Sequence, residues 1–140
     1  MNNSTINANL GSSLMKFTFT DSDGDVLASF RMNPGDIKLA HRCQEVSSYF
    51  ENLGNNTPEH ATIEDAIKFN DVLEDKICYL LGYDAKQSLF GLLSATSIME
   101  DGNMFAVHVM DKIVEHVGPE IQKRKQAMAN AVKKYTAKYQ

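Results

Sequence analysis

Residues 16–32 have the sequence KFTFTDSDGDVLASFRM, and this stretch decides how the chain begins to fold. Polar and apolar residues alternate in residues 16–20, so that Phe17 and Phe19 share one face of an expected strand. The turn sequence Asp21-Ser22-Asp23-Gly24 follows, with a glycine that can adopt positive φ. The expected second strand, residues 25–32, has one face formed by Val26, Ala28, Phe30 and Met32. A lone hairpin is marginally stable, so we expect it to pack on helices or to pair with another chain.

The residues after this hairpin predict helices. Asn33-Pro34-Gly35-Asp36 has the features of a helix start: a capping residue, a proline and an acid in the first turn. Thr57 is expected to cap a second helix, which Gly82 ends in the left-handed conformation. Gly54-Asn55-Asn56 is expected to end the first helix, whose apolar stripe consists of Leu39, Cys43, Val46, Phe50 and Leu53. The second helix has one broad apolar face, interrupted by Asn70 and formed by Ile63, Ala66, Ile67, Leu73, Ile77, Leu80 and Leu81.

The last third of the chain predicts a short helix, a loop and more helix. Asp84 can cap a helix over residues 85–90, and Asn103 can cap another after a loop over residues 94–102. Gly118-Pro119 predicts a break or kink, because proline cannot donate a hydrogen bond and clashes with the preceding turn. Beyond it, apolar positions recur at steps of four and three, marred by Lys125, at Ile121, Met128, Val132, Tyr135 and Tyr139.

These patterns predict a mainly α (α+β) fold, an N-terminal β-hairpin followed by a bundle of four to five helices. Residues 1–14 are expected to be a flexible segment, residues 15–117 a hairpin plus helical domain, and residues 118–140 a basic C-terminal helix. With 140 residues, 43% of them hydrophobic, the chain can bury a core without disulfides or metal. It has no apolar run of about 20 residues, no secretory signal at its start and only two cysteines, so we expect a cytoplasmic protein with no membrane partner.

Charge is distributed unevenly. Residues 118–140 hold six of the fourteen basic residues and one of the eighteen acids, a net charge of +5, so the first 117 residues carry −9. An acidic body with a basic tail can dock head to tail with its own copies, or the tail can meet an acidic partner. The alternative is that the basic residues simply form a solvated helix face. Nucleic acid is not favoured as a partner, because the body is acidic and no nucleic-acid-binding signature is present.

No catalytic, metal or cofactor site is predicted. Residues 21–25 (DSDGD) resemble a calcium loop, but the glycine is fourth and position 12 is Met32, so a turn is favoured. Cys43 and Cys78 lie on or beside apolar stripes, where cysteine behaves as a small buried hydrophobe. There is no glycine-rich phosphate loop, and zinc-ligand spacing is absent among His41, His60, His108 and His116.

The order of parts resembles the small tail assembly chaperones of long-tailed (siphovirus-type) phages and prophages of Gram-positive bacteria. The resemblance covers residues 15–135 in architecture and rests on short motifs. They are FRMNPGD (residues 30–36), FNDVL (69–73) followed by LGYD (81–84) and SLFG (88–91), and residues 104–117 followed by QKRK (122–125). It implies a non-enzymatic protein of the host cytoplasm that coats the helical tape-measure protein and then gives way to tail-tube protein.

A client-binding face would be apolar and helical, repeated along a homo-oligomer. Its expected members are Leu89, Phe90, Leu92, Leu93, Met104, Phe105 and Met110, with a basic tail of Lys123, Arg124, Lys125, Lys133 and Lys134. The competing interpretation is that Leu89 to Leu93 form the domain's own core. Two other functions stay open: a structural subunit of the virion (tail or connector), and, less favoured, a small nucleic-acid-binding regulator that uses the basic C-terminus.

Overall fold

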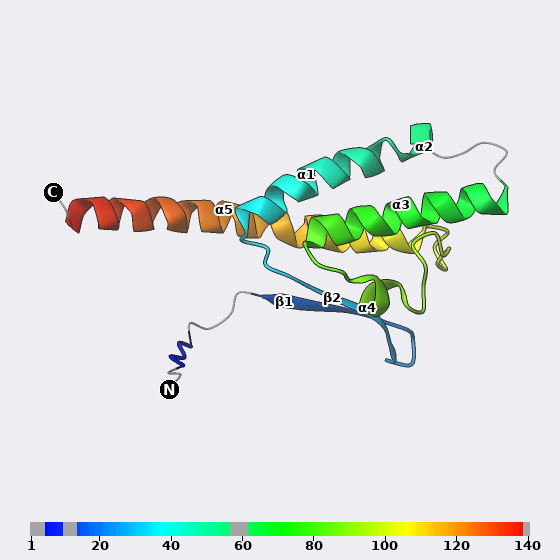
Figure 1. Ribbon diagram of the computed structural model, residues 1–140, viewed down its shortest axis with the longest axis horizontal. Coiled ribbons are helices and arrows are strands. Elements are labelled where there is room, and N and C mark those ends of the chain that lie inside the picture. The colour runs from blue at the N-terminus through cyan, green and yellow to red at the C-terminus, as the bar shows by residue number, and fades with distance from the viewer. Residues whose placement is uncertain (1–4, 10–13, 57–61, 139–140) are drawn as a thin grey trace.

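The computed structural model describes residues 5–9, 14–56 and 62–138. Its elements are β1 (Met15–Thr20), β2 (Val26–Met32), α1 (Ile37–Glu51), α2 (Leu53–Asn56), α3 (Ile63–Leu81), α4 (Lys86–Phe90) and α5 (Phe105–Lys138). The predicted N-terminal hairpin followed by helices is confirmed. Figure 1 shows the long helices α1, α3 and α5 in one layer, with the hairpin and α4 on one side of it. The expected flexible segment falls partly outside the described residues, which omit 1–4 and 10–13.

The hairpin has the predicted strands and turn. Strands β1 and β2 pair antiparallel, with Phe17 opposite Phe30. In the turn Gly24 has a φ of 86°, and the Asp21 carboxylate accepts backbone N–H bonds from Asp23 at 2.9 Å and Asp25 at 3.0 Å. Asp21 therefore closes the turn through its side chain, as turn aspartates commonly do.

The predicted inner face of β2 is correct except at its first residue. Phe19 pairs with Ala28 but Thr20 pairs with Val26, so the register shifts by one residue at this point. The extra residue, Leu27, reverses the alternation of inward and outward side chains. Val26 is consequently exposed, whereas Ala28 and the later inward residues of the strand are buried.

Helix α1 begins later than the sequence predicted and ends at Glu51, before the predicted stop. The N-cap of α1 is Asp36, whose side chain accepts the N–H of Lys38 at 2.9 Å, so Asn33-Pro34-Gly35 precedes the helix. The predicted stop at residues 54–56 is wrong, because these residues belong to the short helix α2. Asn33 is the other candidate cap, and its side chain accepts the N–H of Gly35 at 3.3 Å in the segment before the helix.

Helix α3 starts at a cap that the sequence pattern did not single out. Thr62 is its N-cap and forms a capping box with Asp65, so the helix begins at Ile63. The predicted cap Thr57 lies outside the described residues. The predicted left-handed stop at Gly82 is confirmed, with a φ of 82° and an N–H bond to the Cys78 carbonyl.

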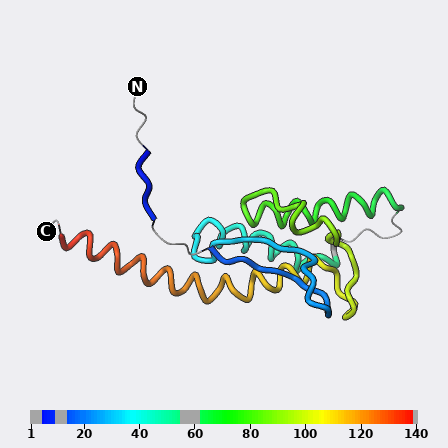
Figure 2. Tube along the Cα trace, turned by 90° about the horizontal axis from the view of Figure 1, so that it is seen from below, coloured from blue at the N-terminus to red at the C-terminus, as the bar shows by residue number. Residues whose placement is uncertain are grey.

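Pro119 does not break the last helix. Helix α5 runs continuously from Phe105 to Lys138, so the predicted boundary between residues 117 and 118 falls within one helix. Its axis bends along the way rather than stopping (Figure 2). An interior proline costs a hydrogen bond and a steric clash, about 3 kcal/mol, and a helix can absorb this by bending. The body and the basic segment are therefore joined by helix rather than by a loop.

The core lies between the inner face of the hairpin and the helices. Phe17 stacks on Phe30 with ring centroids 4.9 Å apart, and Phe105 meets the rings of Phe19 and Phe90 edge to face. The largest fully buried side chains come from every layer and include Phe30, Leu39, Leu73, Ile77, Leu80, Leu89, Phe105 and Ile113. The hairpin is thus held by apolar contact with helices, as its marginal intrinsic stability requires.

Candidate functional site

The side chains expected to face a client are mostly in the protein's own core. Leu89, Phe90, Phe105 and Met110 are buried, which favours the competing interpretation and corrects the surface assignment for these four. Leu93 and Met104 are partly buried against the same core. Only Leu92, of the seven residues named, is largely exposed, at 73% of its accessible surface. The segment from Leu89 to Leu93 therefore supplies core rather than a continuous binding face.

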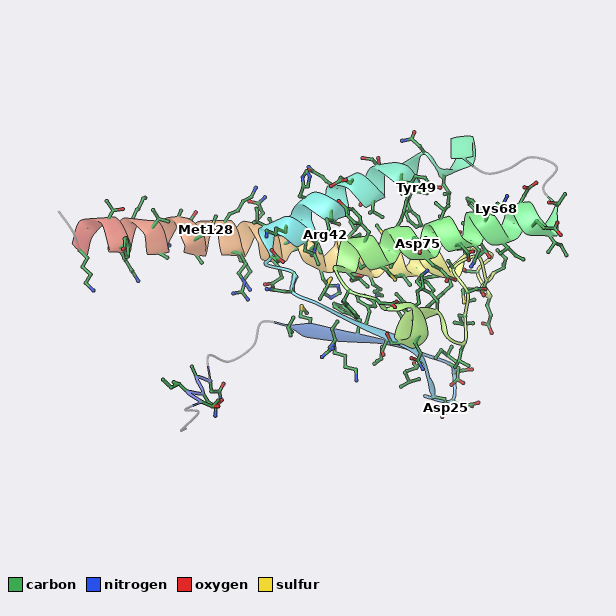
Figure 3. All side chains as sticks on the ribbon, in the orientation of Figure 1. Asp25, Arg42, Tyr49, Lys68, Asp75 and Met128 are labelled. Carbon is green, nitrogen blue, oxygen red and sulfur yellow. The ribbon has the colours of Figure 1, made fainter. Side chains whose placement is uncertain are left out.

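The C-terminal half of α5 projects beyond the body and carries an exposed apolar strip. Figure 3 shows this half of the helix extending past the start of α1, with Met128 on it. Met128, Val132 and Tyr135 are spaced by four and three residues and are exposed by 57, 59 and 68%, respectively. These three residues are called the C-terminal seam below. Tyr139, the next predicted member, lies outside the described residues. A seam of this spacing is the kind that a second helix covers.

The seam continues the face that α5 turns toward α1. Within the body Val117 is buried and Ile121 packs against the core, and both line the space beside α1. Met128 then lines a small depression, about 200 Å³ in volume, with Ile37, the first residue of α1. The stripe on α5 is therefore covered as far as α1 extends and is exposed beyond it.

The basic residues of the tail are in different environments. Arg124 lies against the chain before α1, because a Cβ at Gly35 would collide with its side chain. Lys123 pairs with Glu120 at 3.6 Å on the helix surface. Lys133 and Lys134 are exposed on the projecting turns, and Lys125 is exposed at the point where the helix leaves the body. The projecting part of the helix thus combines an apolar strip with a strongly basic surface.

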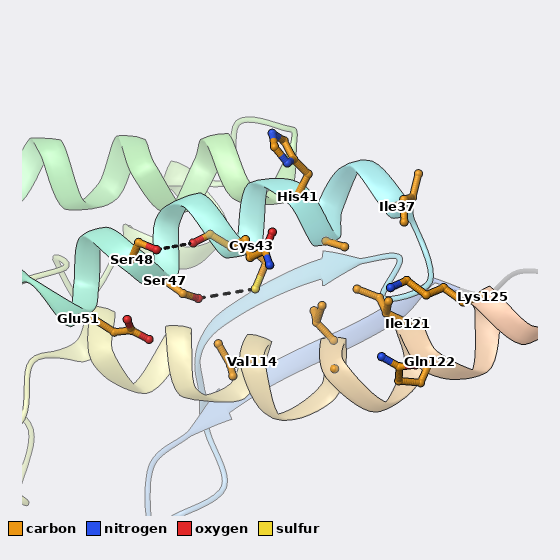
Figure 4. Close-up of a pocket in the computed structure, with 14 residues that line it drawn as sticks. Ile37, His41, Cys43, Ser47, Ser48, Glu51, Val114, Ile121, Gln122 and Lys125 are labelled. Atoms are coloured by element: carbon orange, nitrogen blue, oxygen red, sulfur yellow. Dashed lines mark hydrogen bonds between the residues drawn. The ribbon is translucent and has the colours of Figure 1, made fainter.

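A groove runs between α1 and α5 on the same side as the seam. Its first part has a volume of about 600 Å³, and Figure 4 shows Cys43 and Ser47 on the α1 side and Val114 and Ile121 on the α5 side. Its second part, about 620 Å³, is lined by Phe50 and Met110 among others. The two parts share Ser47, Glu51 and Val114, so they form one continuous feature. We call it the α1–α5 groove.

The second part of this groove is acidic. Glu51, Asp111 and Glu115 line it, and among the described residues no basic side chain does. Its apolar lining comes from Phe50, Val107, Met110 and Val114. Glu115 is paired with Lys112 at 3.3 Å on the surface of α5, an exposed pair that solvent screens strongly. The groove therefore offers an apolar floor with negative charge at its edge.

Both cysteines and two of the described histidines, His108 and His116, have identifiable neighbours. Burial is the largest cause that raises the pKa of the Cys43 and Cys78 thiols, which lowers the fraction of nucleophilic thiolate at neutral pH. His108 pairs with Asp101, and the ring of His116 meets Phe17 edge to face. Within the described ranges, no three histidine, cysteine or acidic side chains come together as metal ligands. The same residues contain no helix long and apolar enough to span a bilayer.

Asn70, which interrupts the apolar face of α3, anchors a loop. Its Oδ1 accepts bonds from the N–H and the hydroxyl of Thr96, both at 2.9 Å, and its Nδ2 donates to Glu74 at 2.8 Å. Glu74 in turn accepts the N–H of Ala95 at 3.1 Å. The sequence signal was the polar residue on an apolar face, but its partners 26 residues away could not be identified from spacing. This network has a structural role in positioning the chain before α5.

Replacing Asn70 by alanine is expected to lower the free energy of unfolding by about 1–3 kcal/mol, because the half-buried N–H of Thr96 loses its acceptor. Denaturant unfolding measures the change, and hydrogen exchange at the Thr96 amide should accelerate. Gln126→Ala, which removes an exposed side-chain bond on α5, is the control and should change stability by less than about 0.5 kcal/mol. Equal effects of the two substitutions would show that the Asn70 network does not hold the loop.

The seam and the groove differ in shape. One is an apolar strip on a projecting helix, and the other is an apolar depression between two helices, so both suit partner recognition by helix packing. In the part of the chain that the structure describes, the acids that line the groove, Glu51, Asp111 and Glu115, are not grouped as metal ligands. No protein-family model matches the chain, and no curated protein and no solved structure shows significant similarity to it.

Proposed function

We propose that this protein is a non-enzymatic tail assembly chaperone that binds the helical tape-measure protein in the host cytoplasm and keeps it soluble until tail-tube protein replaces it. The proposal comes from the resemblance in the order of elements and from one structural observation that supports it. That observation is the C-terminal seam, an apolar strip that α5 carries beyond the body on Met128, Val132 and Tyr135. A chaperone for a long amphipathic helix needs such a strip and needs no reactive group.

The size of the seam fits repeated, reversible binding. Each large apolar side chain that is fully buried contributes roughly 1.5–3 kcal/mol, so three residues per subunit give modest affinity for each contact. Many subunits along one client helix multiply these contacts, and the joint affinity becomes high although each contact can be released. Release matters, because the client has to be handed to the growing tail.

The basic residues around the seam support the same role. Lys133 and Lys134 are exposed on the projecting turns and keep this apolar helix soluble before a client is bound. They also favour client helices that carry acids beside their apolar stripe, since opposite charges at the edge of a helix pair select partners. The seam therefore supplies affinity and the flanking charge supplies selectivity.

Replacing Met128 and Val132 together by aspartate is expected to abolish client binding without unfolding the protein. Both side chains are more than half exposed, so the cost to the fold is small, whereas two carboxylates in the seam cannot be buried against an apolar helix. The measurement is the soluble fraction of a co-expressed tape-measure protein. We expect the wild-type chain to keep it in solution and the double variant to leave it in the pellet.

The matched control is Ile67→Asp, at an apolar residue on α3 that is exposed to a similar extent, 55%. This control should retain client solubility, and circular dichroism should show equal helix content in all three proteins. If the seam variant is folded and still solubilises the client, the C-terminal seam does not bind the client, and the structural support for the proposed function is lost.

A further inference from the structure

The exposed seam and the α1–α5 groove cannot meet within one chain. Helix α5 is continuous from Phe105 to Lys138, and its projecting half leads away from the body, as Figures 1 and 2 both show. Folding the seam back onto the groove would require breaking the helix near Lys125, where it leaves the body. The groove can therefore receive this helix only from another molecule.

The dimensions of the two surfaces match. Helix α1, which forms one wall of the groove, has 15 residues and a length of about 22 Å at 1.5 Å per residue. The part of α5 from Lys125 to Lys138 has a length of about 20 Å by the same rise. Its anchors Met128, Val132 and Tyr135 follow the i, i+4, i+7 pattern of a helix that lies in an apolar groove.

The charges of the two surfaces are opposite. Glu51, Asp111 and Glu115 line the acidic part of the groove, whereas the last turns of α5 carry Lys133, Lys134 and Lys138. Pairing two seams directly would instead bring two basic helices together, which like-charge repulsion opposes. Charge complementarity thus favours the groove over a second seam as the surface that covers this helix.

We propose that the C-terminal helix of a second copy of this chain lies in the α1–α5 groove, with its seam on the apolar floor and its lysines against the acidic edge. This inference deepens the proposed function and rests on it in one respect: the client helix competes with the groove for the same seam. Self-association then keeps the seam covered until the client arrives. The apolar surface of an unoccupied chaperone is protected in this way from non-specific aggregation.

The test is a charge reversal on each surface and their combination in the full-length protein. The tail variant is K133E/K134E/K138E, the groove variant is E51K/D111K/E115K, and the combined variant keeps the net charge of −4. Sedimentation velocity over a concentration series gives the dissociation constant of self-association. We expect each single-surface variant to raise it by about tenfold or more, and the combined variant to restore it to within about threefold of wild type.

Restoration by the combined variant is the decisive result, because changes that merely damage the fold cannot cancel one another. A wild-type chain that stays monomeric throughout the series overturns the inference. So does a groove variant that associates as tightly as wild type, which would indicate pairing of two seams. Retained folding is checked by thermal melting, and should a variant unfold, the single reversals D111K and K134E provide the same comparison.

These outcomes are separable from the proposed function, because no client is present in the experiment. A wild-type chain that stays monomeric but keeps the client soluble in the separate co-expression assay would overturn the groove assignment alone. Normal self-association with no client solubility would instead contradict the chaperone function and leave the homotypic contact standing.

Discussion

Replacing Phe105 by alanine is expected to lower the free energy of unfolding by about 3–5 kcal/mol, a large fraction of the roughly 5–15 kcal/mol typical of a domain. Phe105 is the first residue of α5 and is buried between two other rings, with centroids 5.3 Å from Phe19 and 6.0 Å from Phe90. Its removal leaves a cavity where the hairpin, α4 and α5 meet. Because the hairpin is held by these contacts, we expect it to loosen together with the start of α5.

Chemical denaturation with two probes measures this effect, far-UV circular dichroism for the helices and hydrogen exchange for β1 and β2. The matched control is Leu92→Ala, in the segment that follows α4. Because Leu92 is 73% exposed, this substitution should change the free energy of unfolding by less than about 0.5 kcal/mol. If both variants lost similar amounts of stability, Leu92 would have to be buried against another molecule in solution.

Sequence patterns predicted a strand or a helix end correctly where a single local signal was present. The alternation around Phe17 and Phe19 predicted β1, and Gly82 ended α3 in the conformation expected of a glycine stop. Competing local signals caused the errors in the helix starts. Asn33 and Asp36 are both good N-caps; in the structure Asp36 caps α1, and the Asn33 side chain accepts the N–H of Gly35 before the helix.

The candidate site was harder to predict, because apolar residues look alike in a sequence whether they face a core or a partner. Leu89 and Leu92 are three residues apart, yet one is fully buried and the other is mostly exposed. Helix α4 ends at Phe90, so helical periodicity does not apply across this interval. The spacing of Met128 and Val132 predicted an apolar stripe. Its exposure depends on where α1 begins and so on the tertiary structure, which the spacing does not show.

Truncating the chain after Gln126 is expected to abolish both client solubilisation and self-association while lowering the free energy of unfolding by less than about 1 kcal/mol. The truncation removes the whole C-terminal seam and the lysines of the last turns, which are exposed, so the body loses little buried surface. It retains Ile121, which packs on the core, and Arg124, which lies against Gly35. Thermal melting followed by circular dichroism should therefore remain cooperative, with a smaller helical signal.

The informative comparison is a second truncation after Val117, at the boundary that charge and Gly118-Pro119 had indicated. This shorter chain also loses Ile121 and Arg124, and we expect it to be less stable than the longer truncation by about 1–2 kcal/mol, the value of a partly buried aliphatic side chain. Both truncations should fail in the solubility assay and remain monomeric in sedimentation. If the two were equally stable, the functional helix would begin at Gly118 after all. If the truncation after Gln126 unfolded the body, the projecting turns would be part of the fold and not a separate binding element.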